Sequence, residues 1–182
     1  MIPITKPFIG EEEKKACFDA IGSGWVSQGV KVKDFENLIS NYVNANYAIA
    51  TSSCTTALHV ALLSMGIKKD DEVIVPSFTF IATANSVLYT GAKPVFVDID
   101  EKTYNIDPAK IEEKITEKTK AIIPVHLYGQ PADMEEIKEI AVKHNLIIIE
   151  DACQAHNSEY KNKKIPISET GCFSFFKQRH IK

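Results

Sequence analysis

Residues 71–100 read DEVIVPSFTFIATANSVLYTGAKPVFVDID, in which two short β-rich runs flank a longer mixed stretch. The run EVIVP here, and LIIIE at residues 146–150, are apolar at consecutive positions, which is typical of strands covered on both faces. From residue 47 onward such runs alternate with amphipathic stretches, and this predicts an α/β fold with a mostly parallel sheet. The strands are expected at Tyr47–Thr51, Glu72–Pro76, Pro94–Asp98, Ala121–His126, Leu146–Glu150 and Cys172–Phe175.

Helices are expected between these strands and before the first of them. Apolar residues at three- and four-residue spacing predict a helix over Thr55–Met65, closed by Gly66. Two more are expected at Asp107–Ile115 and Met134–His144. Residues 10–24 are helix-like, and an acidic and aromatic helix is expected at Asp34–Val43. No linker divides the chain, so we expect one domain.

Composition excludes several classes of function. The chain has 182 residues, 45% of them hydrophobic, and a net charge of −3 with scattered charges, which argues against a nucleic-acid partner. It has no leader-like start and no apolar run of membrane-spanning length, so we expect a soluble, cytoplasmic protein. The cysteines are too far apart for a CxxC metal pair, and we expect no metal site and reduced, mostly buried thiols. These cysteines are Cys17, Cys54, Cys153 and Cys172.

Ligands of open α/β sheets bind beyond the carboxyl ends of the strands, and four segments there carry suitable chemistry. Residues 52–56, SSCTT, lie between a strand end and a helix start, where hydroxyls and backbone N–H groups stabilise a phosphate. Serine and threonine are also ordinary N-caps, and both interpretations stay open. The sequence contains no GxGxxG and no GxxxxGK[ST], which removes the main support for dinucleotide and Walker-type sites.

The acidic segment IEDACQAH, residues 149–156, follows an apolar strand directly. A carboxylate there can hold the protonated ring nitrogen of pyridoxal phosphate (PLP), bind Mg²⁺, or cap the next helix, and the residues alone do not separate these three roles. In residues 76–80, PSFTF, an aromatic ring can lie against a flat cofactor or pack in the core. In residues 171–176, GCFSFF, a serine hydroxyl can reach a phosphate.

The order of these segments closely resembles the DegT/DnrJ/EryC1/StrS family of PLP-dependent sugar aminotransferases. The resemblance rests on SSCTTALHVALL, the stretch quoted first, PVHLYGQPADM, IIEDACQAH and GCFSFF, with GSGWVSQGVKVKDFE similar to the family's entrance loop. It covers residues 3–176. It implies the large PLP-binding domain of a type I aminotransferase-like fold, truncated before the small C-terminal domain.

The resemblance also implies which residues bind the phosphate. Cys54 and Thr55 match a Gly-Thr pair that holds it, and Ser174 matches a phosphate-binding serine. Cysteine in place of glycine is a departure, because a side chain would crowd a tight turn and would be strained at positive φ.

The remaining matches concern the ring and the substrate. Phe80 matches the aromatic residue that stacks on the pyridine ring, Asp151 the carboxylate paired with the ring nitrogen, and Gln154 a residue near the phenolic oxygen. Three further residues match positions around the substrate cavity: Trp25, Ser27 and His126.

The implied reaction is a transamination in which glutamate or glutamine supplies the amino group and a nucleotide-linked keto sugar receives it. Such reactions serve amino-sugar and cell-surface polysaccharide biosynthesis, and the family works as homodimers. The Schiff-base lysine should lie five positions beyond Ser174, yet that position is Arg179, whose guanidinium cannot serve. His180 lies one residue from the position at which some family dehydratases carry histidine.

The tail KQRHIK also lacks the glycine-rich stretch of relatives. We therefore expect a truncated and inactive chain with exposed apolar surface. The alternatives are a non-catalytic remnant that binds PLP or a sugar nucleotide, and a relative of PLP-dependent sugar 3-dehydratases.

Overall fold

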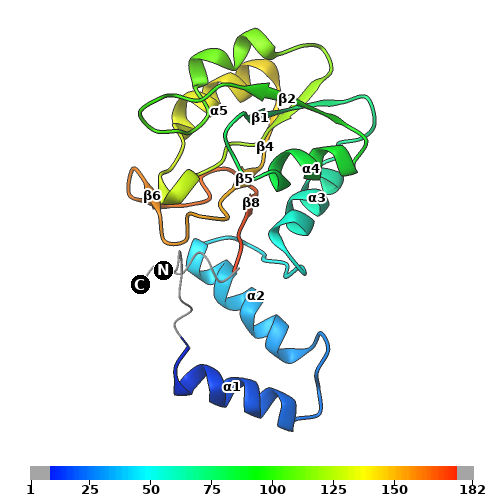
Figure 1. Cartoon of the computed structure of the whole chain (residues 1–182), viewed down its shortest axis with the longest axis vertical. Coiled ribbons are helices and arrows are strands. Elements are labelled where there is room, and N and C mark those ends of the chain that lie inside the picture. The colour runs from blue at the N-terminus through cyan, green and yellow to red at the C-terminus, as the bar shows by residue number, and fades with distance from the viewer. Residues whose placement is uncertain (1–8, 176–182) are drawn as a thin grey trace, which may run out of the picture. The chain divides into compact units, whose positions relative to one another are not determined.

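The computed structural model describes residues 9–175 (Figure 1). The chain divides into two compact units, residues 1–51 with 175–182, and residues 52–174, and each is considered by itself. The division falls between Thr51 and Ser52, where the sequence shows no linker. The sheet, both of its helical layers and all six predicted cofactor residues belong to the second unit.

The first unit contains two helices. Helix α1, Glu11–Gly22, begins with three glutamates, which suit the positive end of the helix dipole, and the Glu13 side chain accepts a hydrogen bond from the Gly10 N–H at 2.6 Å. Helix α2, Val30–Val43, starts four residues earlier than expected and ends where Asn44 adopts a left-handed conformation. Neither helix contains a buried residue.

The strand predicted at Tyr47–Thr51 is wrong. The segment forms no ladder with any strand in the described part of the chain, and Tyr47 is 86% exposed. The Ala50 N–H donates instead to the Glu36 carboxylate at 3.0 Å. Its β-branched and aromatic residues favour extended backbone, but a strand also needs a neighbour.

The second unit is built on a four-stranded parallel sheet, as predicted. Its strands are β1 (Glu72–Pro76), β2 (Lys93–Val97), β3 (Thr119–Ile122) and β4 (Ile147–Ile148), in the order β2-β1-β3-β4. The strand predicted to reach His126 ends at Ile122, and Val125 forms only an isolated bridge to Asp151. Pro124 intervenes and has no N–H to donate to a ladder.

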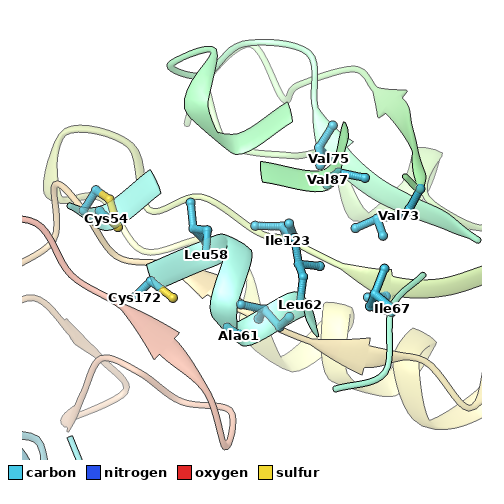
Figure 2. Packing of buried hydrophobic residues seen from close by; sticks show 14 residues of the cluster. Cys54, Leu58, Ala61, Leu62, Ile67, Val73, Val75, Val87, Ile123 and Cys172 are labelled. Carbon is cyan, nitrogen blue, oxygen red and sulfur yellow. A yellow bond between two sulfur atoms is a disulfide. The ribbon is translucent and has the colours of Figure 1, made fainter. Parts of the chain in front are cut away.

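Helices cover both faces of this sheet. Val73 and Val75 pack in one core cluster with α3 (Cys54–Ser64) and α4 (Ala82–Tyr89), and Figure 2 shows Leu58 and Leu62 of α3 within it. Ile74, between the two valines, packs in a second cluster that includes α5 (Met134–His144). Adjacent residues of β1 therefore point to opposite buried layers, which explains its continuous apolar run.

Shorter strands extend the second unit. Strand β5 (Glu150–Asp151) pairs in parallel with β8 (Gly171–Cys172), and β6 (Glu159–Tyr160) forms an antiparallel hairpin with β7 (Lys163–Lys164). The strand predicted at Leu146–Glu150 is thus split between two sheets, and the one predicted at Cys172–Phe175 begins and ends earlier.

Residues 107–115 form two 3₁₀ turns rather than the α-helix that we predicted. These are η1 (Pro108–Lys110) and η2 (Glu112–Lys114), and a third turn, η3, spans Leu127–Gly129. Asp107 caps η1 as an N-cap should, with its side chain accepting from the Ala109 N–H at 3.0 Å. Ile111 is fully buried and Ile115 is already extended, so the chain has room for only single turns before β3.

Apolar side chains are exposed on both units. Among the larger ones are Phe18 and Leu38 in the first unit and Leu63, Leu88 and Phe96 in the second. Within residues 9–175, no helix combines the length and apolar character needed to cross a membrane.

Candidate functional site

Two of the predicted cofactor residues, Phe80 and Asp151, lie beyond strand ends at the topological switch point of the sheet. After β1 the chain crosses to β2 on one side and then returns to β3 on the other, so β1 and β3 flank the topological switch point. Ligands of open α/β sheets bind beyond the carboxyl ends of strands at such points. Phe80 follows β1, and Asp151 bridges to Val125 just beyond β3.

Asp151 is buried and held by hydrogen bonds to both carboxylate oxygens. Thr83 Oγ1 donates to Oδ2 at 2.8 Å, and the Cys153 N–H donates to Oδ1 at 3.2 Å. The Asp151 backbone N–H donates to the Pro124 carbonyl at 2.9 Å. The carboxylate is therefore fixed in position at the end of β5.

Sequence reasoning missed Thr83. It is fully buried in the first turn of α4, 68 positions from its partner in sequence, and Thr79 Oγ1 lies 3.0 Å from its hydroxyl. The only available signal was a pair of threonines four residues apart after β1. The alternative in which Asp151 caps the next helix is wrong, because residues 152–157 form turns and no helix, and its carboxylate accepts from the Cys153 N–H instead.

The segment at the start of α3 is confirmed as an N-cap. Ser53 is the cap residue, its hydroxyl accepts from the Thr56 N–H at 3.2 Å, and the Ser52 and Ser53 hydroxyls both contact Thr56 Oγ1. The first helical N–H groups have no carbonyl one turn back, so this end still favours an anion. Cys54 is the first residue of the helix, and its φ is not positive, so the expected backbone strain is absent.

The expectation of reduced thiols is wrong for two of the four cysteines. Cys54 and Cys153, 99 residues apart in sequence, form a disulfide, which is visible in Figure 2 at the start of α3. Cys17 and Cys172 are free. The error arose because spacing along the sequence does not show that the start of α3 lies next to the segment that follows β5.

The aromatic residues after β1 do not pack in the core. Phe80 is 62% exposed and Phe78 is 48% exposed, so the alternative of core packing is wrong. Gln154 is partly buried, and its side-chain oxygen accepts from the Tyr128 N–H at 2.9 Å, which leaves the amide nitrogen as its donor. Ser174 lies two residues beyond β8, the strand that pairs with β5.

His126, predicted near the substrate, is fully buried. Its Nδ1 accepts from the Ala132 N–H at 3.0 Å, so the ring proton is on Nε2, which donates to Glu150 Oε2 at 2.8 Å. Burial raises the pKa of the Glu150 carboxyl, but the hydrogen bonds from His126 and Ser168 outweigh it, and the net pKa lies below its usual value. Both ring nitrogens are thus engaged within the protein.

The other two predicted substrate residues, Trp25 and Ser27, lie in the first unit between α1 and α2. Both are exposed, and Trp25 Nε1 donates to the Gln28 carbonyl at 3.0 Å. A Cβ at Gly29 would lie 2.1 Å from Trp25 Nε1, so a side chain at this position would displace the Trp25 ring. Arg179, with Lys177, His180 and Lys182, lies outside the described residues.

Comparison with known proteins gives a consistent result. The family model described as the DegT/DnrJ/EryC1/StrS aminotransferase family matches residues 7–182. The chain is 46% identical over 182 residues to GDP-perosamine synthase of Caulobacter vibrioides, covering 99% of this chain and 49% of that protein. It is 44% identical to the spore coat polysaccharide biosynthesis protein SpsC of Bacillus subtilis, covering 99% and 46%.

The fold comparison agrees. Spr1654 from Streptococcus pneumoniae is assigned to the sugar aminotransferases. Its pyridoxamine phosphate (PMP) form superposes with a TM-score of 0.95 at 32% identity, over 98% of this chain and 49% of that one. The type I aminotransferase-like fold is confirmed. The chain spans about half the length of the curated relatives it matches.

Proposed function

Because the chain belongs to the DegT/DnrJ/EryC1/StrS aminotransferase family, we propose that it forms the PLP-binding part of an aminotransferase that acts on nucleotide-linked keto sugars. The observation that carries this proposal is the buried carboxylate of Asp151, held by Thr83 and by the Cys153 N–H at the switch point of the sheet. A fixed negative charge there suits a ring nitrogen that must keep its proton. When bound, PLP supplies an electron sink for carbanion chemistry.

Three side chains of this unit would hold the ring. Asp151 would accept a hydrogen bond from the pyridine nitrogen. The exposed face of Phe80 is available for stacking, because the ring takes no part in packing the core. Gln154 is oriented by Tyr128 and would donate its amide N–H to the phenolic oxygen.

The phosphate would bind at the start of α3. The helix dipole and the first N–H groups favour an anion at this end, and Cys54 and Thr55 are the first two helical residues. Thr55 offers a hydroxyl, and Ser174 would supply another from the segment after β8. His126 and Glu150 would not contact the cofactor, but would fix the backbone on which Asp151 lies.

The substrate, donor and assembly are part of the same proposal. The name of GDP-perosamine synthase supports a nucleotide-linked sugar as acceptor, and that of SpsC supports a place in polysaccharide biosynthesis. Glutamate or glutamine would be the amino donor, Trp25 and Ser27 would contribute to the substrate site, and the working form would be a cytoplasmic homodimer.

A second candidate is a protein that binds PLP or a sugar nucleotide without catalysis, and Arg179 is the observation that favours it. Guanidinium keeps its proton at all ordinary pH values, so Arg179 cannot act as a nucleophile or as a base. Borohydride reduction in the presence of PLP separates the two candidates. A pyridoxyl adduct that mass spectrometry maps to one particular lysine, rather than to many exposed lysines, supports the first candidate, whereas reversible binding without such an adduct supports the second.

The test of the cofactor site is a titration with PLP followed by absorbance. We expect saturable binding by the wild-type chain and at least roughly tenfold weaker binding by D151N, which removes the negative charge. The matched control is D133N, which changes an exposed aspartate beside α5. Equal affinity of D151N and D133N would remove Asp151 from the site, and no binding by any of the three would reject the proposed function.

A further inference from the structure

The disulfide between Cys54 and Cys153 joins the two segments to which the proposed function assigns opposite ends of the cofactor. Cys54 precedes the phosphate-binding Thr55 at the start of α3, and Cys153 lies two residues after Asp151. The two sulfurs and one Asp151 carboxylate oxygen lie within 4.8 Å of one another. The roles of these two segments in cofactor binding rest on the proposed function, whereas the presence of the disulfide does not.

The pairing is selective. Cys172 is also buried in the same core cluster, yet it is free, and burial together with the nearby Asp151 raises the pKa of its thiol to about 12. Cys17 is exposed and lies in the first unit. The chain therefore carries one pair that is joined and two cysteines that serve as internal references, one exposed and one buried.

Two considerations favour a reversible disulfide. In the cytoplasm, where the proposed function places the protein, disulfides are usually transient and either catalytic or redox-sensing. The thiolate is the attacking species in thiol–disulfide exchange, and the N-terminus of a helix favours a negative charge. The Asp151 carboxylate lies within 4.8 Å of both sulfurs and opposes either thiolate, but of the two cysteines only Cys54 begins a helix, the eleven-residue α3, so we expect exchange to start there.

We propose that Cys54 and Cys153 are a reversible thiol–disulfide modification site, at which oxidation by a small-molecule disulfide such as oxidised glutathione locks the start of α3 to the segment after Asp151. The Cys54 thiolate attacks the small disulfide and releases one thiolate of it. The Cys153 thiolate then attacks the Cys54 sulfur and releases the second. Two electrons pass from the protein sulfurs to the small molecule, which leaves as two thiols with the two protons.

Oxidation acts on the cofactor site through pre-organisation. The disulfide fixes the first turn of α3 relative to Cys153, whose N–H holds Asp151 Oδ1. In the reduced chain the two segments are joined only by packing, and binding must restrict them first. Restricting one or two side chains and their turns changes affinity by about two- to tenfold, so the oxidised chain should bind PLP more tightly by this factor.

The experiment equilibrates the chain at defined ratios of oxidised to reduced glutathione. One sample is denatured, alkylated with N-ethylmaleimide and weighed by mass spectrometry, a second is used for amide hydrogen exchange, and a third for PLP titration. The proposal expects two labels at the oxidising end, on Cys17 and Cys172, and four at the reducing end. Exchange at residues 54–56 and 151–154 should be slower in the oxidised chain.

Two variants complete the test. C153S should abolish the dependence of the amide hydrogen-exchange rates on the glutathione ratio, and C17S should keep it. Four N-ethylmaleimide labels at every glutathione ratio, or amide hydrogen exchange that does not change with this ratio in the wild type, would overturn the proposal. If PLP binds neither form while labelling and exchange still respond, the modification site stands and the proposed function fails.

Discussion

Replacing Glu150 by alanine should lower the free energy of unfolding by about 3–5 kcal/mol, because three hydrogen-bond donors lose the carboxylate that accepts from them. Glu150 is fully buried and accepts hydrogen bonds from His126 Nε2 at 2.8 Å, from the Ile167 N–H at 3.0 Å and from the Ser168 N–H. Alanine leaves all three donors without their acceptor. An unsatisfied buried donor costs about 1–3 kcal/mol, and only His126 is completely buried, so the sum falls in the same range.

The assay is urea denaturation followed by far-ultraviolet circular dichroism, with linear extrapolation to water. The matched control is E112A, which removes an exposed carboxylate that contacts Lys143 and His144 at 2.7 Å, and which should have little effect. If E150A does not fold, E150Q keeps the shape and one acceptor oxygen and gives a measurable intermediate loss. A loss below about 1 kcal/mol for E150A would refute the account of this buried network.

Three further predictions concern the same region. The pKa of folded Glu150 lies below the ordinary value of 4.5, so its contribution to stability is complete above about pH 4.5 and is lost as the pH falls through the lowered pKa. The melting temperature of the wild type should therefore fall more steeply below pH 4.5 than that of E150Q. Equal slopes for the two proteins would contradict this. T83V removes the hydrogen bond to Asp151 and should lower the free energy of unfolding in urea by about 1.5–3 kcal/mol and weaken PLP binding. T83S should restore both. Unchanged stability of T83V would show that the bond contributes nothing. F80A should change stability by less than about 0.5 kcal/mol, because the ring is exposed, yet weaken PLP binding, and equal PLP affinity of F80A and wild type would exclude stacking.

Strand β1 could be predicted to the residue because both of its faces are buried, and a short, continuous β-branched run is characteristic of a strand in that position. Helix α5 was equally clear, since its apolar residues recur at helical spacing and His144 ends it. Helix α4 was missed because two of its buried residues, Thr83 and Ser86, are polar and hide the helical pattern. The strand predicted at Tyr47–Thr51 failed because pairing depends on the rest of the fold.

The candidate site divides in the same way. Asp151 and Phe80 could be found because each follows closely on a strand run, where the sheet alone determines their position. Their stabilising contacts could not be found, since the Thr83 hydroxyl and the Cys54 sulfur come from distant parts of the sequence. The burial of His126 was hidden for the same reason, as its partner Glu150 lies 24 residues further on.

The long sequence separation between Thr83 and Asp151 has a consequence for biosynthesis. Short sequence distances separate α3, β1, α4 and β2, so these elements can associate while the ribosome is still translating. The 68 residues to Asp151 take on the order of 3–14 s to add at ordinary translation speeds. During that interval the nascent chain displays the start of α3 and the exposed Phe80 without their acidic partner, so recruitment of a cofactor during synthesis must wait until β5 and β8 have left the exit tunnel.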